Sequence, residues 1–329
     1  MSAPKLTDKP AETLPVQRIL KEVSRRIVGQ DAMIERLLVG MLTGGHILLE
    51  GVPGLAKTLA VRTLAEIIHA SFSRIQFTPD LLPADVIGTM VFDQKSQDFY
   101  VKKGPLFAQI ILADEINRAP AKVQAALLEA MQEHQVTIGG TTYRLEEPFL
   151  VLATQNPLEM DGTYPLPEAQ LDRFFLKLQV TYPSFEDLSE IVDRTTQRQE
   201  RLLEPILQEA KILEAQQFVR DVPIASHVKN YAIRMVMATH PQTQAASEQV
   251  KRYVRYGSSP RGVQSLVLAG KVRALFQGRF HVSIEDLRAV ALSCLRHRLI
   301  LNFEGEAEGV DSTDLIRDIL EHLPEQAPR

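Results

Sequence analysis

Apolar residues in the first half of the chain form short runs, and several of the stretches between these runs have helical periodicity. The runs have the length of buried strands and lie at 46–50, 74–78, 109–113, 149–154 and 175–180. Over 59–70 and 121–135, the apolar positions instead suit one face of a helix. Strands that alternate with helices predict an α/β fold with a parallel sheet covered by helices on both faces.

Further elements precede the alternating strands and helices or lie between them. Amphipathic helices are expected over 15–27 and after the break at 29–31. Two β-hairpins are expected, one from 90–93 with 98–102 and one from 135–138 with 141–145. The second hairpin surrounds Gly139-Gly140, the kind of pair that a two-residue turn requires.

The strand-like runs disappear after residue 182, and the rest of the chain has helical patterns. Helices are expected at 186–203, 206–219, 224–239, 260–277, 284–301 and 314–323. The acidic stretch 304–308 is predicted to be a loop. We therefore predict an α/β domain over 1–182 and a helical domain over 183–329.

The sequence EGVPGLAKTL at 50–59 has the features of a phosphate-binding loop between a strand and a helix. Bound phosphates need converging backbone N–H groups, a helix N-terminus and a cation. Lys57 would reach the β- and γ-phosphates, and the Thr58 hydroxyl would bind Mg²⁺. The residues assigned to nucleotide binding here are Gly51, Val52, Pro53, Gly54, Leu55, Ala56, Lys57 and Thr58.

One position departs from the usual pattern G-x-x-x-x-G-K-[ST], because Ala56 stands where glycine is expected. We predict that Ala56 already lies at the start of the helix with a negative φ, where alanine is tolerated. On the loop alone, a Gly/Pro turn ahead of a helix, with a lysine there by chance, is an alternative.

Residues 110–115, IILADE, form an apolar run that ends in two carboxylates. Acidic residues at the end of a buried strand lower stability unless they have a role. Asp114 suits a ligand of Mg²⁺, directly or through water, and Glu115 suits the base that polarises an attacking water. A strand that runs out into solvent would also explain the two acids. Together with the glycine loop, they favour nucleotide hydrolysis.

Composition places few further limits. The chain has 329 residues, 45% of them hydrophobic, and its net charge of −4 gives no overall attraction to nucleic acid or an anionic membrane. The single cysteine, Cys294, excludes an intrachain disulfide and indicates a reducing compartment. Residues 1–12 lack the apolar core of a signal peptide, and no apolar run approaches the ~20 residues of a membrane span. We expect a cytoplasmic protein.

Nearly the whole chain also resembles the MoxR-type AAA+ ATPases. The matching segments are GVPGLAKT at 51–58, RIQFTPDLLPADVIG at 74–88, KGPLFAQIILADEINRAP at 103–120, ALLEAMQE at 126–133, LATQNP at 152–157, LPEAQLDRF at 166–174 and SPRG at 259–262. Members of this family also have alanine before the lysine. The resemblance implies an AAA+ P-loop NTPase core with hairpin inserts and an all-α lid domain, ATP and Mg²⁺ as cofactors, and a homo-oligomeric ring, expected to be a hexamer.

The resemblance implies roles for four further residues. Asn156 resembles the sensor that holds the attacking water, and Arg173 resembles an arginine finger that acts on a neighbour's nucleotide. Arg261 resembles a second sensor delivered by the helical domain, and the backbone near Gln30 resembles the segment that contacts adenine. An Asn-Pro turn and ordinary surface arginines are the alternatives to the first three roles.

The function that the resemblance implies is ATP-driven, chaperone-like remodelling or maturation of client proteins, often with von Willebrand factor A-domain partners. A magnesium-chelatase-like motor subunit is an alternative, although glycine is usual at the position of Ala56 there. A DNA-handling AAA+ motor is a second alternative, but Arg144 is the only basic residue in the hairpin at 135–145, and nucleic acid is not an expected partner. A non-enzymatic scaffold is a third, which the pair of acids disfavours. Both hairpins resemble inserts that touch substrate, and both can equally be stabilising edge hairpins.

Overall fold

The chain folds into two compact units. The computed structural model describes residues 16–52, 54–157, 163–196 and 203–325. Residues 22–213 form one unit, which we call the sheet unit, and residues 1–21 together with 214–329 form the other, which we call the helical unit. This division differs from the one predicted after residue 182. The helix α8 (Phe185–Thr196) belongs to the sheet unit, where Arg194 donates hydrogen bonds to the carbonyl oxygens of Ser24 and Arg25 at 2.7 and 3.1 Å.

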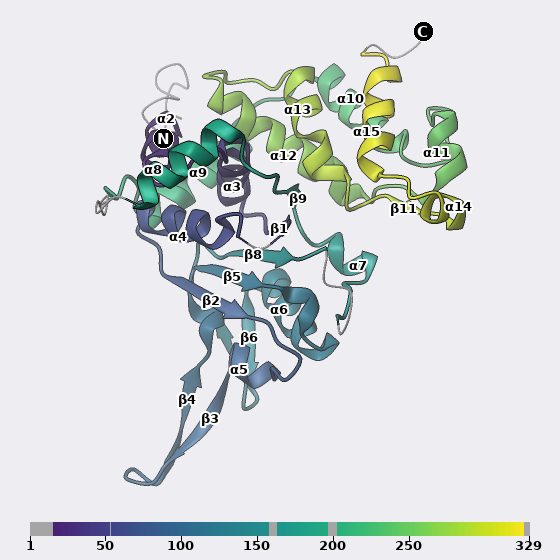
Figure 1. Ribbon diagram of the computed structural model, residues 1–329. Coiled ribbons are helices and arrows are strands. Elements are labelled where there is room, and N and C mark those ends of the chain that lie inside the picture. Colours follow the sequence, from purple (N-terminus) through teal and green to yellow (C-terminus); the bar gives the residue numbers. More distant parts are fainter. Residues whose placement is uncertain (1–15, 53, 158–162, 197–202, 326–329) are drawn as a thin grey trace, which may run out of the picture. The chain divides into compact units, whose positions relative to one another are not determined.

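A five-stranded parallel sheet is the centre of the sheet unit (Figure 1). Its strand order is β2 (Phe72–Gln76), β5 (Ile110–Asp114), β8 (Leu150–Gln155), β1 (Ile47–Glu50) and β9 (Leu176–Gln179). Each neighbouring pair runs in parallel. The predicted parallel sheet is therefore confirmed. Because all five strands point the same way, the residues at their carboxyl ends meet at one edge of the sheet.

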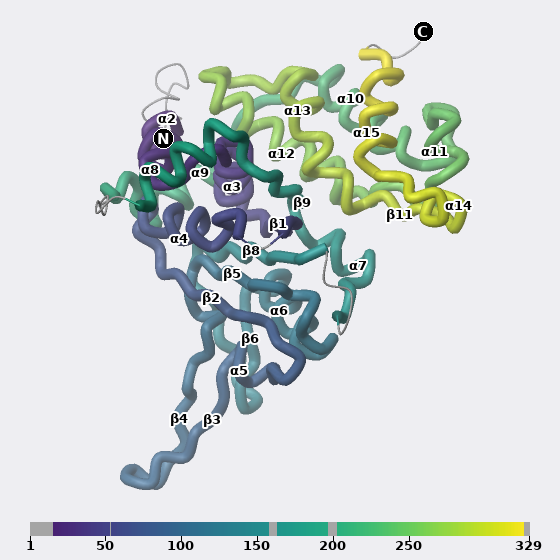
Figure 2. Tube along the Cα trace, viewed as in Figure 1, coloured from purple at the N-terminus to yellow at the C-terminus, as the bar shows by residue number. Residues whose placement is uncertain are grey.

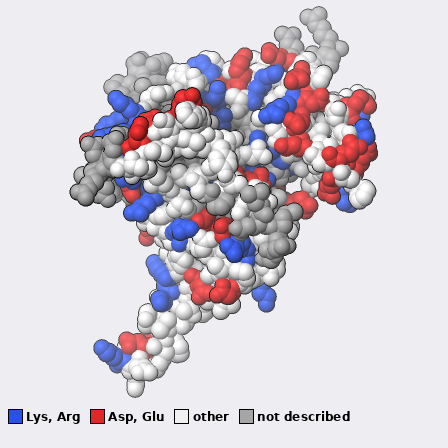
Figure 3. All heavy atoms as spheres, viewed as in Figure 1, with Lys and Arg blue, Asp and Glu red and all other residues white. Residues whose placement is uncertain are grey.

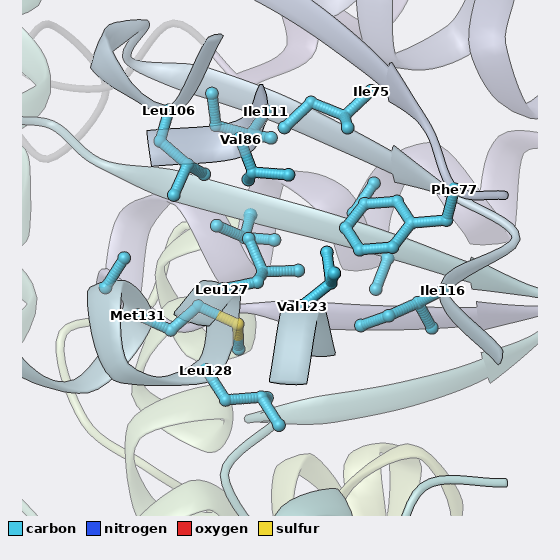
Figure 4. Close-up of a cluster of buried hydrophobic side chains, with 14 of the residues drawn as sticks. Ile75, Phe77, Val86, Leu106, Ile111, Ile116, Val123, Leu127, Leu128 and Met131 are labelled. Carbon is cyan, nitrogen blue, oxygen red and sulfur yellow. The ribbon is translucent and has the colours of Figure 1, made fainter. Parts of the chain in front are cut away.

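Helices cover both faces of this sheet (Figure 1). The helices α3 (Asp31–Thr43) and α4 (Lys57–Ile67) lie on one side, and α6 (Ala121–Glu133) lies on the other. Figure 4 shows that Val123, Leu127, Leu128 and Met131 of α6 point into a buried cluster with Ile111 of the sheet. The short helix α5 (Pro83–Ile87) closes this cluster with a fully buried Val86. Apolar burial of this kind, at about 25 cal/mol per Å², fixes the sheet on which the functional residues stand.

Both predicted hairpins are present. The strands β3 (Gly88–Asp93) and β4 (Asp98–Lys103) form the first, and β6 (Gln135–Ile138) and β7 (Thr141–Arg144) form the second. Gly139 and Gly140 have φ values of +59° and +84°, as the two-residue turn requires.

The hairpin β3–β4 projects from the sheet (Figure 2). Its cross-strand pair Phe92 and Phe99 has ring centroids 5.1 Å apart, yet these side chains are 50% and 59% exposed. Uncharged side chains cover much of its length, with charged residues near its tip (Figure 3). A two-stranded ribbon with exposed aromatic residues gains little from its own packing.

The boundary at residues 213 and 214, where the chain enters the helical unit, lies within α9 (Glu209–Asp221). The helical unit contains α10 (Ser226–Met237), α11 (Glu248–Tyr253), α12 (Pro260–Phe276), α13 (Ile284–Leu295), α14 (Phe303–Ala307), α15 (Ser312–His322) and residues of α2 (Val16–Ser24). Within the described residues, no helix has both the length and the apolar character needed to cross a membrane.

The sheet unit also contains three short elements: α7 (Glu168–Leu171) and the 3₁₀ turns Pro105–Phe107 and Ile116–Arg118.

Two expectations for this unit are wrong in detail. Strands are not absent after residue 182, because β10 (Val254–Tyr256) pairs antiparallel with β11 (Ile300–Leu301). The acidic stretch 304–308 is largely helical rather than a loop, because α14 covers it. The N-cap residue of α14, Asn302, accepts a hydrogen bond from the Gly305 N–H at 2.9 Å, which the sequence pattern had not suggested.

A buried histidine joins three elements of the sheet unit. His46, just before β1, is only 6% exposed. Its Nε2 lies 2.9 Å from the Met131 carbonyl oxygen at the end of α6, and its Nδ1 accepts a hydrogen bond from the Val151 N–H of β8 at 3.0 Å. A neutral imidazole can donate from one nitrogen and accept at the other, whereas an imidazolium can only donate. Burial lowers the pKa of His46 from 6.5 to about 4.

We expect this histidine to make the sheet unit acid-sensitive. The unfolded chain takes up the proton near pH 6.5 and the folded protein only near pH 4, so the free energy of unfolding falls as the pH drops between these values. The expected loss by pH 4 is about 3 kcal/mol. Urea unfolding at pH 6.5, 5.5 and 4.5 measures it. His46→Gln should reduce the acid slope, and exposed His227→Gln should leave it unchanged. An NMR titration of His46 with a midpoint above pH 6 would contradict this account.

Candidate nucleotide-binding site

The glycine loop connects β1 to α4, as predicted. The Gly51 N–H donates to the Gln155 carbonyl oxygen of β8 at 3.3 Å, and a Cβ at Gly51 would lie 3.1 Å from Val180. Gly54 has a φ of +87°, a conformation that favours glycine. Lys57 and Thr58 are the first two residues of α4. Pro53, which we had assigned to the loop, lies outside the described residues.

The prediction for Ala56 was wrong. Ala56 has a φ of +55° and a ψ of +19°, so it is the left-handed residue that precedes α4 rather than its first helical residue. An L-residue in this conformation costs about 1–2 kcal/mol, a penalty that glycine avoids. The loop therefore keeps the backbone path of the glycine pattern despite the alanine.

Lys57 is turned toward its own loop. Its Nζ donates to the Gly51 carbonyl oxygen at 2.7 Å, which places the ammonium group beside the loop backbone. Burial lowers the pKa of Lys57, while the nearby charges of Asp114 and Glu115 act in the opposite direction. Lys57 is thus close enough to both acids for their charges to act on it, while it is bonded to the loop backbone.

Asp114 and Glu115 lie at the carboxyl end of β5, and Thr154 of β8 forms a hydrogen bond with each of them. The Thr154 hydroxyl donates to Asp114 Oδ1 at 2.6 Å and accepts a hydrogen bond from the Glu115 N–H at 2.8 Å. Glu115 has a φ of +57°, uncommon for a residue with a side chain. Strained backbone of this kind concentrates at functional sites. Thr154 was not among the predicted site residues.

Three further side chains contact the acids, and none of them was predicted. Arg74 of β2 donates to Asp114 Oδ2 through Nε at 3.1 Å and through a terminal nitrogen at 2.6 Å. Gln76 of β2 donates to Glu115 Oε2 at 2.9 Å, and Arg118 donates to the same oxygen at 3.0 Å. Arg74 and Gln76 alternate with apolar residues on a strand of the sheet, and this alternation is the signal that could have identified them.

A cavity of about 410 Å³ gathers seven of the predicted residues. It is lined by Gly54, Ala56, Lys57, Thr58, Leu59, Arg74, Gln76, Asp114, Glu115 and Asn156. It lies at the carboxyl ends of the strands, where ligands of open α/β sheets bind. The carboxylate of Asp114 and the hydroxyl of Thr58 are oxygen ligands of the kind that Mg²⁺ takes together with phosphate and water. The donor set therefore fits a Mg²⁺-bound nucleoside phosphate.

Other predicted residues lie outside this cavity. Gly51, Val52 and Leu55 do not line it, although they belong to the same loop. Gln30 is buried and donates to the Thr181 carbonyl oxygen at 3.2 Å. Arg173 lines a different cavity of about 380 Å³ beside α6, where it donates to the Leu128 carbonyl oxygen at 3.2 Å.

Arg261 belongs to the helical unit. It lies at the start of α12, and its N–H donates to the hydroxyl of the N-cap residue Ser259 at 3.2 Å. Its side chain is exposed. The expected start of this helix at residue 260 is thus confirmed, with Ser259 as its N-cap.

A larger cavity, of about 800 Å³, lies in the helical unit. Residues of α10, α11 and α15 line it, with Ile319 and Leu323 among its apolar walls. Its lining includes neither a glycine loop nor acids at a strand end. Size alone therefore does not select it as the nucleotide site.

Known proteins with similar sequences cover nearly the whole chain. A family profile described as "ATPase family associated with various cellular activities" matches residues 46–176, and one described as an AAA lid domain matches residues 246–319. Chaperone MoxR1 of Mycobacterium tuberculosis is 46% identical over 313 residues, which are 94% of this chain and 82% of that protein. Protein MoxR of Methylorubrum extorquens is 30% identical over 93% of this chain and 94% of that protein.

A solved structure agrees with these matches. The crystal structure of a candidate ATPase from Cytophaga hutchinsonii superimposes with a TM-score of 0.90 at 48% sequence identity. The match covers 96% of this chain and 95% of that one. The similarity therefore includes both the sheet unit and the helical unit.

The conformation of Ala56 leads to a stability prediction. Ala56→Gly should raise the free energy of unfolding by about 0.5–1 kcal/mol, because glycine adopts the positive φ without strain. The matched control is Ala125→Gly at an exposed interior position of α6, which should lower stability by about 1 kcal/mol. Urea unfolding of both variants measures the two values. Destabilisation of similar size by both substitutions would contradict the left-handed assignment.

Proposed function

Since the chain belongs to the MoxR family of AAA ATPases, we propose that it uses ATP hydrolysis in the cavity of the sheet unit for chaperone-like remodelling or maturation of client proteins. Membership of the family makes the protein an ATPase that binds a nucleotide. The observation that carries the proposal is one cavity lined by Lys57, Thr58, Asp114, Glu115 and Asn156.

Each residue of this cavity has a task suited to its chemistry. The loop amides and Lys57 hold phosphate oxygens, for which Lys57 exchanges its contact with the Gly51 carbonyl oxygen. Thr58 and Asp114 are the residues that would hold Mg²⁺. Bound there, Mg²⁺ would neutralise charge on the β- and γ-phosphates. Glu115 accepts a proton from the attacking water, and the Asn156 amide can donate to phosphate while accepting from that water.

The arginines complete the site from other parts of the assembly. We assign Arg173 to the nucleotide of a neighbouring subunit, because it lines a separate cavity of its own sheet unit. We assign Arg261 to the γ-phosphate as part of the lid, and the backbone near Gln30 to adenine. AAA ATPases typically form rings, and we propose a homo-oligomeric hexamer in which these contacts occur.

The client-directed part of the proposal rests on the relatives. Two proteins similar over most of this chain have MoxR names, and one of them is named a chaperone. A von Willebrand factor A-domain partner, a cytoplasmic location and contact of clients with the hairpin β3–β4 remain predictions. The magnesium-chelatase-like and DNA-handling alternatives are not favoured by these relatives.

Removal of the base should separate ATP binding from hydrolysis. Glu115→Gln keeps the shape of the side chain but cannot accept the proton, so steady-state hydrolysis should fall by about 100-fold or more. Binding of a fluorescent ATP analogue should stay within about threefold of wild type. Glu146→Gln, at an exposed position outside the cavity, serves as the control with unchanged turnover. Equal turnover by Glu115→Gln would overturn the assignment of the base.

The assignment of Arg173 predicts complementation between two inactive variants. Arg173→Ala and Lys57→Ala should each lose ATPase activity. Mixing them should restore some, because a site with intact Lys57 from the first variant can receive Arg173 from the second. Random mixing in equal amounts makes about one interface in four complete. The double variant Lys57→Ala/Arg173→Ala, mixed with Arg173→Ala, should restore nothing. Absence of rescue at every ratio would count against action in trans.

A further inference from the structure

Asp114, the acid assigned to Mg²⁺, already has a cation beside it. Arg74 of β2 approaches Asp114 Oδ2 with two nitrogens, at 3.1 and 2.6 Å. The other oxygen, Oδ1, accepts the hydroxyl of Thr154 at 2.6 Å. Any divalent cation that binds Asp114 through Oδ2 would have to replace a guanidinium group, because two cations that share one oxygen repel each other.

The position of Arg74 indicates more than an ordinary surface ion pair. Arg74 lines the same cavity as Lys57 and Thr58, so it faces the space assigned to phosphate and metal. It also donates to Gln76 Oε1 at 2.6 Å, which directs the amide nitrogen of Gln76 toward Glu115. One arginine thus neutralises the metal-binding acid and orients the residue that contacts the catalytic acid.

The ion pair between Arg74 and Asp114 is weak enough for metal and nucleotide to replace it. The Arg74 side chain is 48% exposed and that of Asp114 is 15% exposed. A pair of which one member is so exposed contributes little to stability, because water screens it. Nucleotide and metal binding can therefore break the pair at small cost. The charge of Arg74 then becomes available to phosphate within the same cavity.

We propose that Arg74 is the counter-ion of Asp114 before nucleotide binds, and that it gives up this carboxylate to Mg²⁺ and turns to the nucleotide phosphates when Mg²⁺ and nucleotide arrive together. This inference rests on the proposed function of the site. It makes Arg74 a positioning residue that opposes metal binding alone and supports metal binding with nucleotide.

The exchange predicts two opposite effects of one substitution. Arg74→Gln should bind Mn²⁺ without nucleotide about tenfold more tightly than wild type, because the competing charge is gone. The same variant should bind a fluorescent ADP analogue about threefold or more weakly in saturating Mg²⁺, because the phosphates then lose the cation that turns to them. Electron paramagnetic resonance of free Mn²⁺ measures the first effect, and fluorescence anisotropy measures the second.

Two controls assign the effects to Asp114. Arg62→Gln removes the same charge from an exposed position of α4, where Arg62 pairs with Glu66, and should change neither affinity. Adding Asp114→Asn to Arg74→Gln should abolish the gain in Mn²⁺ affinity. Lower or unchanged Mn²⁺ affinity of Arg74→Gln, in protein with the circular dichroism spectrum of wild type, would overturn the inference and leave Arg74 a support of the sheet edge.

The same titrations separate failure of this inference from failure of the proposed function. Wild-type protein that binds no ADP analogue, with or without Mg²⁺, would refute the nucleotide site itself. Wild-type protein that binds the analogue, combined with an Arg74→Gln variant of unchanged Mn²⁺ affinity, would refute only the exchange.

Discussion

The repulsion between two adjacent carboxylates at the end of a buried strand is the constraint on which the site depends. Asp114 and Glu115 leave the sheet together, and both need donors that hold them in place. Most of these donors come from the neighbouring strands on either side of β5, with Arg74 and Gln76 on β2 and Thr154 on β8, and Arg118 adds one from the turn that follows β5. The parallel register places Gln76 directly beside Asp114, so the sheet order itself makes the acid pair tolerable.

The features predicted from sequence are those that local chemistry determines. A glycine loop between an apolar strand and a helix, or an apolar strand that ends in acids, can be recognised within ten residues. The contacts of Arg74 and Thr154 with Asp114 could not be recognised in this way, because each is separated from it by 40 residues and depends on which strands are neighbours. Ala56 was placed wrongly because its φ is set by the closure of the loop onto α4, not by a helical pattern.

The same distinction applies to the fold. The five central strands follow from apolar runs, the hairpin β6–β7 from its glycine turn and the hairpin β3–β4 from the polar turn at 94–97, all of which are local signals. The pairing of β10 with β11 joins residues more than 40 positions apart, and each strand is too short to show a pattern of its own. Arg194 of α8, which lies in the sheet unit, bonds to the carbonyl oxygens of Ser24 and Arg25, which are likewise distant in sequence.

The cations of the cavity already form contacts with protein groups, and a bound phosphate would have to replace these contacts. Lys57 bonds to the Gly51 carbonyl oxygen and Arg74 to Asp114, so each of these two cations has a partner within the protein. Arg118, which does not line the cavity, bonds to Glu115. A phosphate that binds in the proposed site would exchange these partners rather than meet free charges. The net gain is then the difference between two sets of contacts, each of modest strength. Such a difference is what a nucleotide-driven conformational change requires, because a ligand shifts a conformational equilibrium only by its unequal affinity for the two states.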